Sequence, residues 1–202
     1  MKNKKSWAID ATHSEIAFKV KHLMIANIRG AFEIFDANIY TTGKDFKTAE
    51  IDLWIDAGSI TTGDEKRDGH LKGADFFDVL NHRQITFISD SIGKADEDGN
   101  HKLWGKLTMK GVTQKVKLNV KFGGIAKDPM GNEKAGFTVT GKINRNDWGL
   151  TWNTTIETGG LVVSEEVKIL CEVELTNVSQ KELTMELETS TSKRIVHSAE
   201  LV

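Results

Sequence analysis

Apolar residues alternate with polar ones over most of this chain. In five segments the apolar residues recur at every second position, and these segments span 16–20, 51–55, 116–122, 137–143 and 167–175. A period of two places such side chains on one face of a β-strand and leaves the charged residues on the other face. Short connections between such segments favour antiparallel pairing. We therefore expect an all-β fold in which one face of each strand is buried.

Turn residues separate these segments and set the number of strands. Less regular strands are expected at 30–40, 84–92 and 102–109, which gives about eight strands in all. Glycine-containing turns such as Thr42-Gly43-Lys44 and Asp98-Gly99-Asn100 lie between them. The single proline, Pro129, falls in a predicted turn, where it removes no ladder hydrogen bond. Such strands either pair as a sandwich or close as a barrel, and closure removes the exposed edges.

Residues 59–78 interrupt the alternation. Charged residues crowd between Asp64 and Lys72, and Leu71, Ala74 and Phe77 recur at roughly helical spacing. We predict a short helix here, interrupted near residue 73, that covers an opening of the barrel. Beyond the last strand the chain is polar and rich in Ser, Thr and Glu. The expected organisation is therefore one barrel domain over 6–177, followed by a C-terminal tail over 178–202.

Composition excludes several classes of protein. The formal net charge of −2 provides no basic surface for nucleic acid. No segment approaches the roughly 18 apolar residues of a membrane-spanning helix, and a single cysteine allows no internal disulfide. The first residues are basic, but Asp10, His13 and Glu15 replace the apolar stretch of a signal peptide. We expect a soluble cytoplasmic protein with no nucleic-acid partner and no transmembrane segment, and whether it forms a homodimer is left open.

Catalytic and metal-binding motifs are not found. None of the six histidines lies in a metal-binding spacing, and no nucleophile elbow or phosphate-binding loop is present. Arg67, Asp68 and His70 form a charged cluster that fits a helix end or a contact with a ligand head group better than acid–base catalysis. We predict that Arg67 and His70 lie near the barrel opening and that Arg67 pairs with Asp68 or Asp75. No catalytic residue, metal or cofactor is expected.

Small residues occupy several positions on the apolar face of the strands. Gly105, Gly141, Ala57 and Cys171 each share strand parity with large apolar neighbours. A barrel filled for stability places bulky side chains at such points, so small ones leave space. Bulges or sharp coiling are the alternative explanation for the glycines. Taken together, the set favours an internal cavity.

One tryptophan-containing segment is predicted to be a further strand with an apolar face. Trp148, Leu150 and Trp152 recur at every second position. Such a face forms core or a pocket wall, and in a barrel interior it can form both.

Several motifs follow one another in order along the chain. They are Asp10 with His13-Ser14 and Phe18, Val20-Lys21-His22, Gly30-Ala31-Phe32, Ser59-Ile60-x-Thr62-Gly63, Arg67-Asp68-x-His70-Leu71-Lys72, Asp75-Phe76-Phe77-Asp78, Ile85-Thr86-Phe87, Gly105-x-Leu107-Thr108-x-x-Gly111-Val112-Thr113, Ile143-Asn144-Arg145-x-Asp147-Trp148-Gly149-Leu150-x-Trp152 and Glu165-Glu166-Val167. Together they resemble the YceI-like family of lipocalin-like polyisoprenoid-binding proteins. The chain departs from that family at Arg83, where a proline is usual, in its start without a signal peptide, and in its tail.

The resemblance implies an extended antiparallel lipocalin-like barrel with a helix near one opening and a long apolar pocket. It implies non-catalytic binding or carriage of a polyisoprenoid, such as a prenyl diphosphate or a quinone tail, or of another long-chain lipid. No catalytic residues carry over from the family. Two alternatives stay open: an enzyme that acts on an isoprenoid lipid through His70, Arg67 or His22, and a filled-core barrel that binds protein on its rim.

Strand parity, together with the motifs, gives a set of candidate ligand-binding residues. The set is Phe18, Val20, His22, Phe32, Leu53, Arg67, His70, Phe76, Phe77, Phe87, Leu107, Val139, Gly141, Trp148, Leu150 and Trp152.

Overall fold

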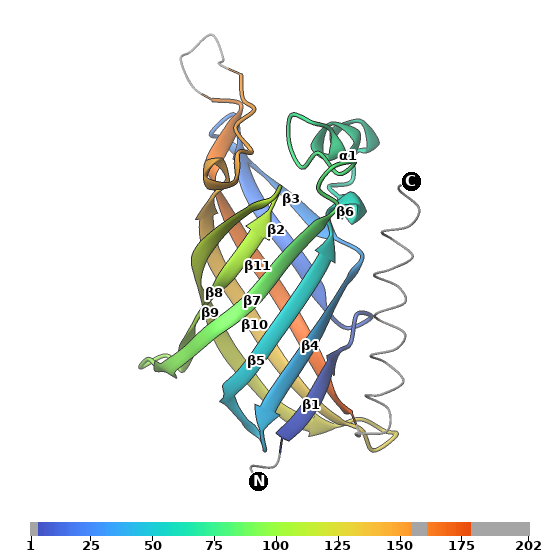
Figure 1. The fold of residues 1–202 in the computed structure, drawn as a ribbon, viewed down its shortest axis with the longest axis vertical. Coiled ribbons are helices and arrows are strands. Elements are labelled where there is room, and N and C mark those ends of the chain that lie inside the picture. Colours follow the sequence, from blue (N-terminus) through green and yellow to red (C-terminus); the bar gives the residue numbers. More distant parts are fainter. Residues whose placement is uncertain (1–3, 155–160, 179–202) are drawn as a thin grey trace.

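A computed structural model of the protein describes residues 4–154 and 161–178. Most of this part of the chain is β-strand (Figure 1). The elements in chain order are β1 (Lys4–Ile9), β2 (Glu15–His22), β3 (Ala26–Phe32), β4 (Phe35–Thr42), β5 (Asp45–Asp56), the 3-10 turn η1 (Ala57–Ser59), β6 (Ile60–Thr61), α1 (Glu65–Lys72), β7 (Gln84–Ala95), β8 (Asn100–Met109), β9 (Val112–Lys127), β10 (Glu133–Asn144), η2 (Arg145–Trp148) and β11 (Val163–Val178).

Eight antiparallel strands close into a barrel. Their order around it is β1-β4-β5-β7-β8-β9-β10-β11, and β1 pairs with β11 to complete the circle. The long strand β11 pairs with β1 over its last residues and with β2 over Val163–Glu172. β2, β3 and β6 therefore extend the wall beyond the point where β1 ends. The predicted all-β fold is confirmed, and closure leaves these eight strands without a free edge.

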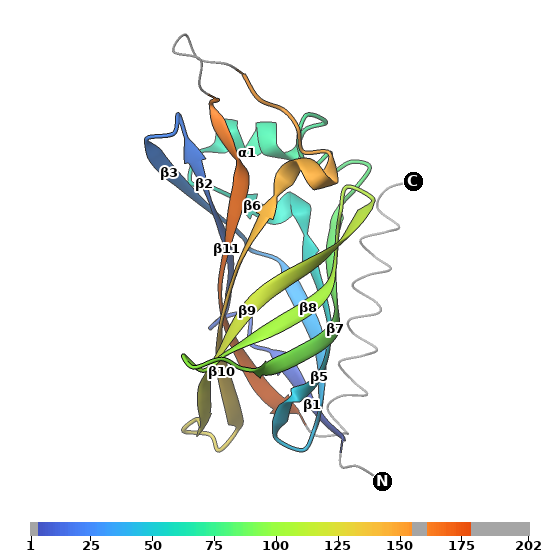
Figure 2. The same cartoon turned by 90° about the vertical axis from the view of Figure 1, so that its left-hand side faces the viewer.

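The predicted short helix is α1, which lies at one end of the barrel (Figures 1 and 2). It begins after Asp64, whose carboxylate accepts a hydrogen bond from the backbone N–H of Arg67, and it ends at Gly73. None of its residues is buried. Among the described residues, no helix is long and apolar enough to cross a membrane.

The predicted strand through 148–152 is wrong. The chain forms the 3-10 turn η2 there, and Gly149 ends it with a left-handed φ of 73°. The side chain of Asn144 accepts a hydrogen bond from the backbone N–H of Asn146, and such a local bond competes with strand pairing. Trp148 is consequently buried, with its indole N–H donating to the carbonyl of Leu107 at 3.0 Å. The single strand predicted at 30–40 is also wrong, because this region contains the end of β3 and the start of β4.

Arg83, which stands where the resembled family usually has proline, stabilises the link between β5 and η1. Its guanidinium donates twice to the buried carboxylate of Asp56, from Nε at 3.2 Å and from Nη2 at 3.1 Å. Its carbonyl accepts from the backbone N–H of Ala57 at 2.8 Å. The ion pair thus connects the residue before β7 to the end of β5. The predicted tail, apart from its first residue Val178, lies outside the described residues.

Candidate functional site

A cavity of about 910 Å³ lies inside the barrel. Its lining residues extend from Arg67 of α1 to Phe46 beside the β4–β5 turn, so it follows the length of the barrel. Apolar side chains such as Leu53, Leu118 and Val139 form its walls. An apolar cavity of this size suits a ligand that is itself long and apolar.

Most of the residues predicted from sequence line this cavity. Those that line it are Phe18, Val20, His22, Phe32, Leu53, Arg67, His70, Phe76, Phe77, Phe87, Leu107, Val139, Leu150 and Trp152. Gly141 and Trp148 are not among its lining residues. Contact of any of them with a ligand stays a prediction.

The space beside the inward glycines is taken by neighbouring side chains, so these positions are not themselves part of the cavity, contrary to the sequence prediction. A Cβ atom on Gly141 would lie 2.5 Å from Cδ2 of Leu118, its neighbour across the ladder. At Gly105 and Gly30 the Cβ would lie 2.4 Å from the rings of Phe87 and Phe18. Each glycine therefore makes room for a large side chain laid across it. The cavity exists because those large side chains lie along the wall instead of filling the centre.

At the α1 end, aromatic and imidazole rings from distant parts of the chain meet. The ring of His70 lies 4.7 Å from that of Trp152 and 5.1 Å from that of Phe76, centroid to centroid. Phe77 contacts Phe32 of β3 at 5.9 Å. The segment that contains α1 and the turn after it thus covers this end of the cavity. We call this end the roof.

A buried guanidinium also faces the cavity at the roof. Arg145 is only 4% exposed and donates hydrogen bonds to the carbonyls of Ser164, Leu150 and Trp152. Burial lowers the pKa of Arg145 from its ordinary value, and the nearby Glu165 acts in the opposite sense. Within the described residues, Arg145 forms no ion pair with a carboxylate. The sequence analysis did not include Arg145 among the candidate residues, although its parity with Ile143 on the preceding strand places it on the inner face.

The predicted ion pair of Arg67 is not formed. Its Nε donates to the hydroxyl of Thr62 at 2.7 Å and its Nη2 to the carbonyl of Thr62 at 2.9 Å. Asp68 instead accepts hydrogen bonds from Thr62, and Asp75 lies 3.2 Å from Nε2 of His70. Thr62 thus forms hydrogen bonds with both Arg67 and Asp68, which had been predicted to pair with each other. Arg67 and His70 do lie near the end of the cavity, as predicted.

At the opposite end, four aromatic residues form a cluster, and three of them, Phe46, Phe122 and Phe137, line the cavity. Phe46 of β5 lies 4.9 Å from Trp7, 4.9 Å from Phe137 and 5.7 Å from Phe122, centroid to centroid. We call this aromatic cluster the floor. Phe46 has the opposite parity to Ile51 on its own strand, so alternation predicts that it faces outward. A break in the ladder between Tyr40 and Thr42 reverses the phase and turns Phe46 inward, and sequence parity cannot detect that break.

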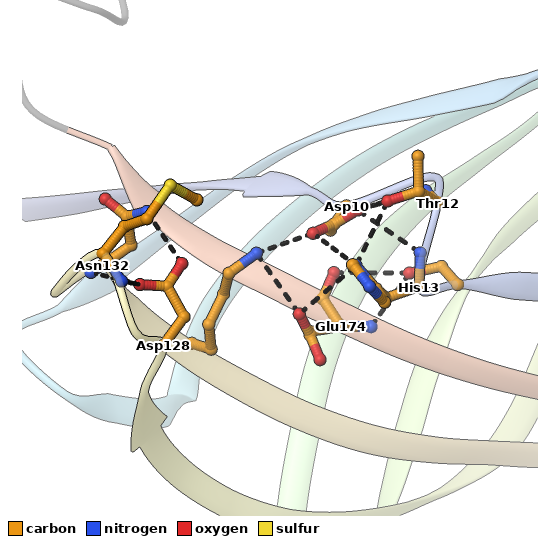
Figure 3. A network of polar contacts seen from close by, with 9 residues as sticks. Asp10, Thr12, His13, Asp128, Asn132 and Glu174 are labelled. Atoms are coloured by element: carbon orange, nitrogen blue, oxygen red, sulfur yellow. Dashed lines mark hydrogen bonds and ion pairs between the residues drawn. The ribbon is translucent and has the colours of Figure 1, made fainter.

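One group of candidate metal ligands occurs among the described residues, away from the cavity lining. Asp10, His13 and Glu174 place their ligand atoms within 4.8 Å of one another (Figure 3). Nζ of Lys134 lies 2.6 Å from Asp10 and 3.2 Å from Glu174. The hydrogen bond from Lys134 is the largest cause of the lowered pKa of Asp10. A protein cation therefore already occupies the position between the two carboxylates.

Comparison with known proteins places the chain among others of this architecture. The profile of the YceI-like domain matches residues 7–175. A UPF0312 protein of Staphylococcus aureus is 37% identical over 164 residues, which cover 81% of this chain and 92% of that protein.

Solved structures agree with this assignment. The crystal structure of a YceI protein from Campylobacter jejuni is 33% identical, with a TM-score of 0.67 and coverage of 79% of this chain and 90% of that one. A polyisoprenoid binding domain from Saccharophagus degradans shares the fold, at 17% identity and a TM-score of 0.59 over 85% of this chain and 98% of that one. On the strength of the profile match and the identities above 30%, the chain belongs to the YceI-like family.

Proposed function

We propose that this protein binds and carries a long apolar lipid, a polyisoprenoid, in the interior of its barrel and does not act on it chemically. The observation that carries the proposal is the apolar cavity that extends from the roof to the floor. A barrel filled for stability alone would contain no such space. The fold shared with a polyisoprenoid binding domain of another organism supports the same ligand class.

The energetics suit such a ligand. Large ligands realise about 0.3 kcal/mol per non-hydrogen atom, so a lipid of about 40 carbons reaches roughly 12 kcal/mol without any strong polar contact. The cavity wall needs only to exclude water along the chain. Polar contacts are then available to select the head group.

The head group is proposed to lie at the roof. Arg145 and Arg67 line the cavity there, and within the described residues neither guanidinium has a carboxylate partner. A phosphate or a quinone oxygen would accept hydrogen bonds from these donors, and a phosphate would also balance their charge. The two chemistries are distinguished by comparing a prenyl diphosphate with a quinone of equal chain length.

The test uses delipidated protein and two variants of β10. Uptake of prenyl diphosphate, prenyl alcohol and prenyl quinone is measured by native mass spectrometry, together with the Tm. We expect one lipid per chain and a raised Tm, because a ligand that binds only the folded state stabilises it. Val139→Trp, on the cavity wall, should block uptake, whereas Thr138→Trp, on the outer face of the same strand, should not.

Two results would contradict the proposal. If no lipid of the series binds and none changes the Tm, the protein is not a lipid carrier. If the recovered lipid is chemically altered by the wild type but not by the Val139→Trp variant, the protein is an enzyme rather than a carrier.

A further inference from the structure

The ring of Phe46 reaches into the lumen of the barrel at the floor and meets a ring from the opposite wall. In the order of strands around the barrel, β5 and β10 have three strands between them in either direction, so they lie on opposite walls. Phe46 comes from β5 and Phe137 from β10, yet their ring centroids are 4.9 Å apart in an edge-to-face arrangement. A contact between opposite walls can form only across the lumen. The pair of rings therefore narrows the apolar part of the cavity at this end, where Lys44, Asp45 and Lys47 also belong to its lining.

The backbone around Phe46 is held in an irregular conformation that turns the ring inward. Opposite β5, the register passes from Tyr40–Glu50 to Thr42–Asp45, so four residues of β5 face a single residue of β4. Side-chain bonds replace the missing ladder bonds: the hydroxyl of Thr48 accepts from the backbone N–H of Thr42 at 2.7 Å and donates to the carbonyl of Asp45 at 2.6 Å. The position of Phe46 is thus fixed by local hydrogen bonds.

The turn that carries Phe46 is also anchored to the rest of the floor. The hydroxyl of Thr41 accepts from the indole N–H of Trp7 at 3.0 Å and donates to the carbonyl of Gly43 at 2.7 Å. The ammonium group of Lys44 contacts the carboxylate of Glu133, at the start of β10. These contacts connect the turn to two other strands. Phe46 is therefore held firmly enough to act as a stop.

Resting on the proposed function, we propose that Phe46 sets the longest lipid chain that the cavity holds. A chain that passes the ring meets Lys44 and Asp45 of the β4–β5 turn instead of a further stretch of apolar wall. An additional isoprene unit must fold back or remain in water, so it adds nothing to the affinity. Up to that length, each added unit is buried against the wall and increases the affinity.

The experiment measures affinity against chain length. A series of all-trans prenyl diphosphates, each one isoprene unit longer than the last, displaces a short fluorescent prenyl diphosphate from the full chain. Wild type should bind more tightly with each unit up to a limit and then no more tightly. In Phe46→Ala the limit should move to a longer chain. The first chain beyond the wild-type limit should bind about tenfold more tightly to Phe46→Ala than to wild type.

Two further variants keep the test decisive. Phe46→Trp, with a larger ring, should move the limit to a shorter chain, and it replaces Phe46→Ala if that variant does not fold. Phe35→Ala removes the same atoms from a buried phenylalanine that does not line the cavity. It should lower the Tm and leave the limit unchanged.

The outcomes separate this proposal from the one on which it rests. An unchanged limit in both Phe46 variants, or an equal loss of affinity for every chain in Phe46→Ala, overturns the role of Phe46 while lipid binding stands. A wild-type protein that binds no member of the series overturns the proposed function, and the chain-length proposal with it.

Discussion

The roof and the floor close the same cavity by different physical means. The floor is built from large aromatic side chains on β1, β5, β9 and β10, which are strands of the closed barrel. The roof contains the short helix α1, which has no buried residue and is held by its caps and by hydrogen bonds to Thr62, and the buried Phe76 follows it in the turn. Unfolding the floor would break the barrel, whereas the helix can loosen alone. On the proposed function, this difference predicts that the lipid enters past the roof and stops at the floor.

The two ends also differ in how their charges are balanced. At the floor, Lys5 and Lys44 both contact the carboxylate of Glu133. At the roof, Arg67 and Arg145 have only neutral oxygen acceptors among the described residues. These two cations at the floor share a carboxylate partner, so their position has a structural explanation. Unbalanced cations beside an apolar cavity are what a ligand head group would complete.

The largest effect is expected from the replacement of Arg145, one of the two cations at the roof that have no carboxylate partner among the described residues. Replacing Arg145 by Met leaves the carbonyls of Ser164, Leu150 and Trp152 without this donor. We expect a loss of about 3 kcal/mol in the free energy of unfolding, measured by urea titration, because buried acceptors are left unsatisfied. The variant should also lose the preference for a prenyl diphosphate over the matching alcohol.

Arg145→Lys serves as the control for this prediction. It retains the charge and part of the hydrogen bonding, so it should retain most of the preference for the diphosphate. If Arg145→Met keeps the wild-type preference while it remains folded, Arg145 is a structural residue of the roof and makes no head-group contact.

A smaller effect is expected at the floor, and it depends on pH. The hydrogen bond from Lys44 is the largest cause that lowers the pKa of Glu133, to about 2 from an ordinary 4.5. A carboxyl with a lowered pKa in the folded state stabilises it above the unfolded pKa and loses that contribution as the pH falls toward 2. Glu133→Gln should therefore cost about 1 kcal/mol near neutral pH and progressively less in acid.

Urea titrations of wild type and Glu133→Gln at about pH 7 and about pH 3 test this sign. Glu50→Gln is the matched control, because its ion pair with Lys4 is exposed on both sides and should contribute little at either pH. A difference between wild type and Glu133→Gln that does not shrink in acid would contradict the stated role of this carboxylate.

The sequence predicted the wall of the cavity better than its two ends, for a physical reason. Along regular strands, a period of two fixes the face of every side chain, so Phe87, Leu107 and Val139 were assigned to the interior correctly. At the ends the chain leaves that period. A ladder irregularity turns Phe46 inward, and the 3-10 turn η2 buries Trp148 in the core, away from the cavity. Such local hydrogen-bonded deviations have no simple signature in hydrophobic alternation.

The glycines show a second limit of prediction from the sequence. Parity correctly indicated that Gly141 faces inward, but it could not show which neighbour uses the space. In the structure that neighbour is Leu118. Cross-strand register, which decides such contacts, depends on turns and bulges over the whole sheet.

The smallest expected effect concerns the roof helix and tests whether it loosens alone. Asp64 caps α1 by accepting a hydrogen bond from the backbone N–H of Arg67 at 2.8 Å. Asp64→Ala removes this acceptor, which costs about 1 kcal/mol of helix stability. Amide hydrogen exchange in α1 should become about fivefold faster, whereas the amides of β5 should be unaffected. Asp64→Asn retains a side-chain oxygen and should restore slow exchange.

Since α1 has no buried residue, the Tm should change little, and a saturating prenyl lipid should slow exchange in α1 again if the lipid lies beneath it. Exchange that rises equally in α1 and β5 would mean that roof and barrel unfold as one unit, and the contrast between the two ends would then be wrong.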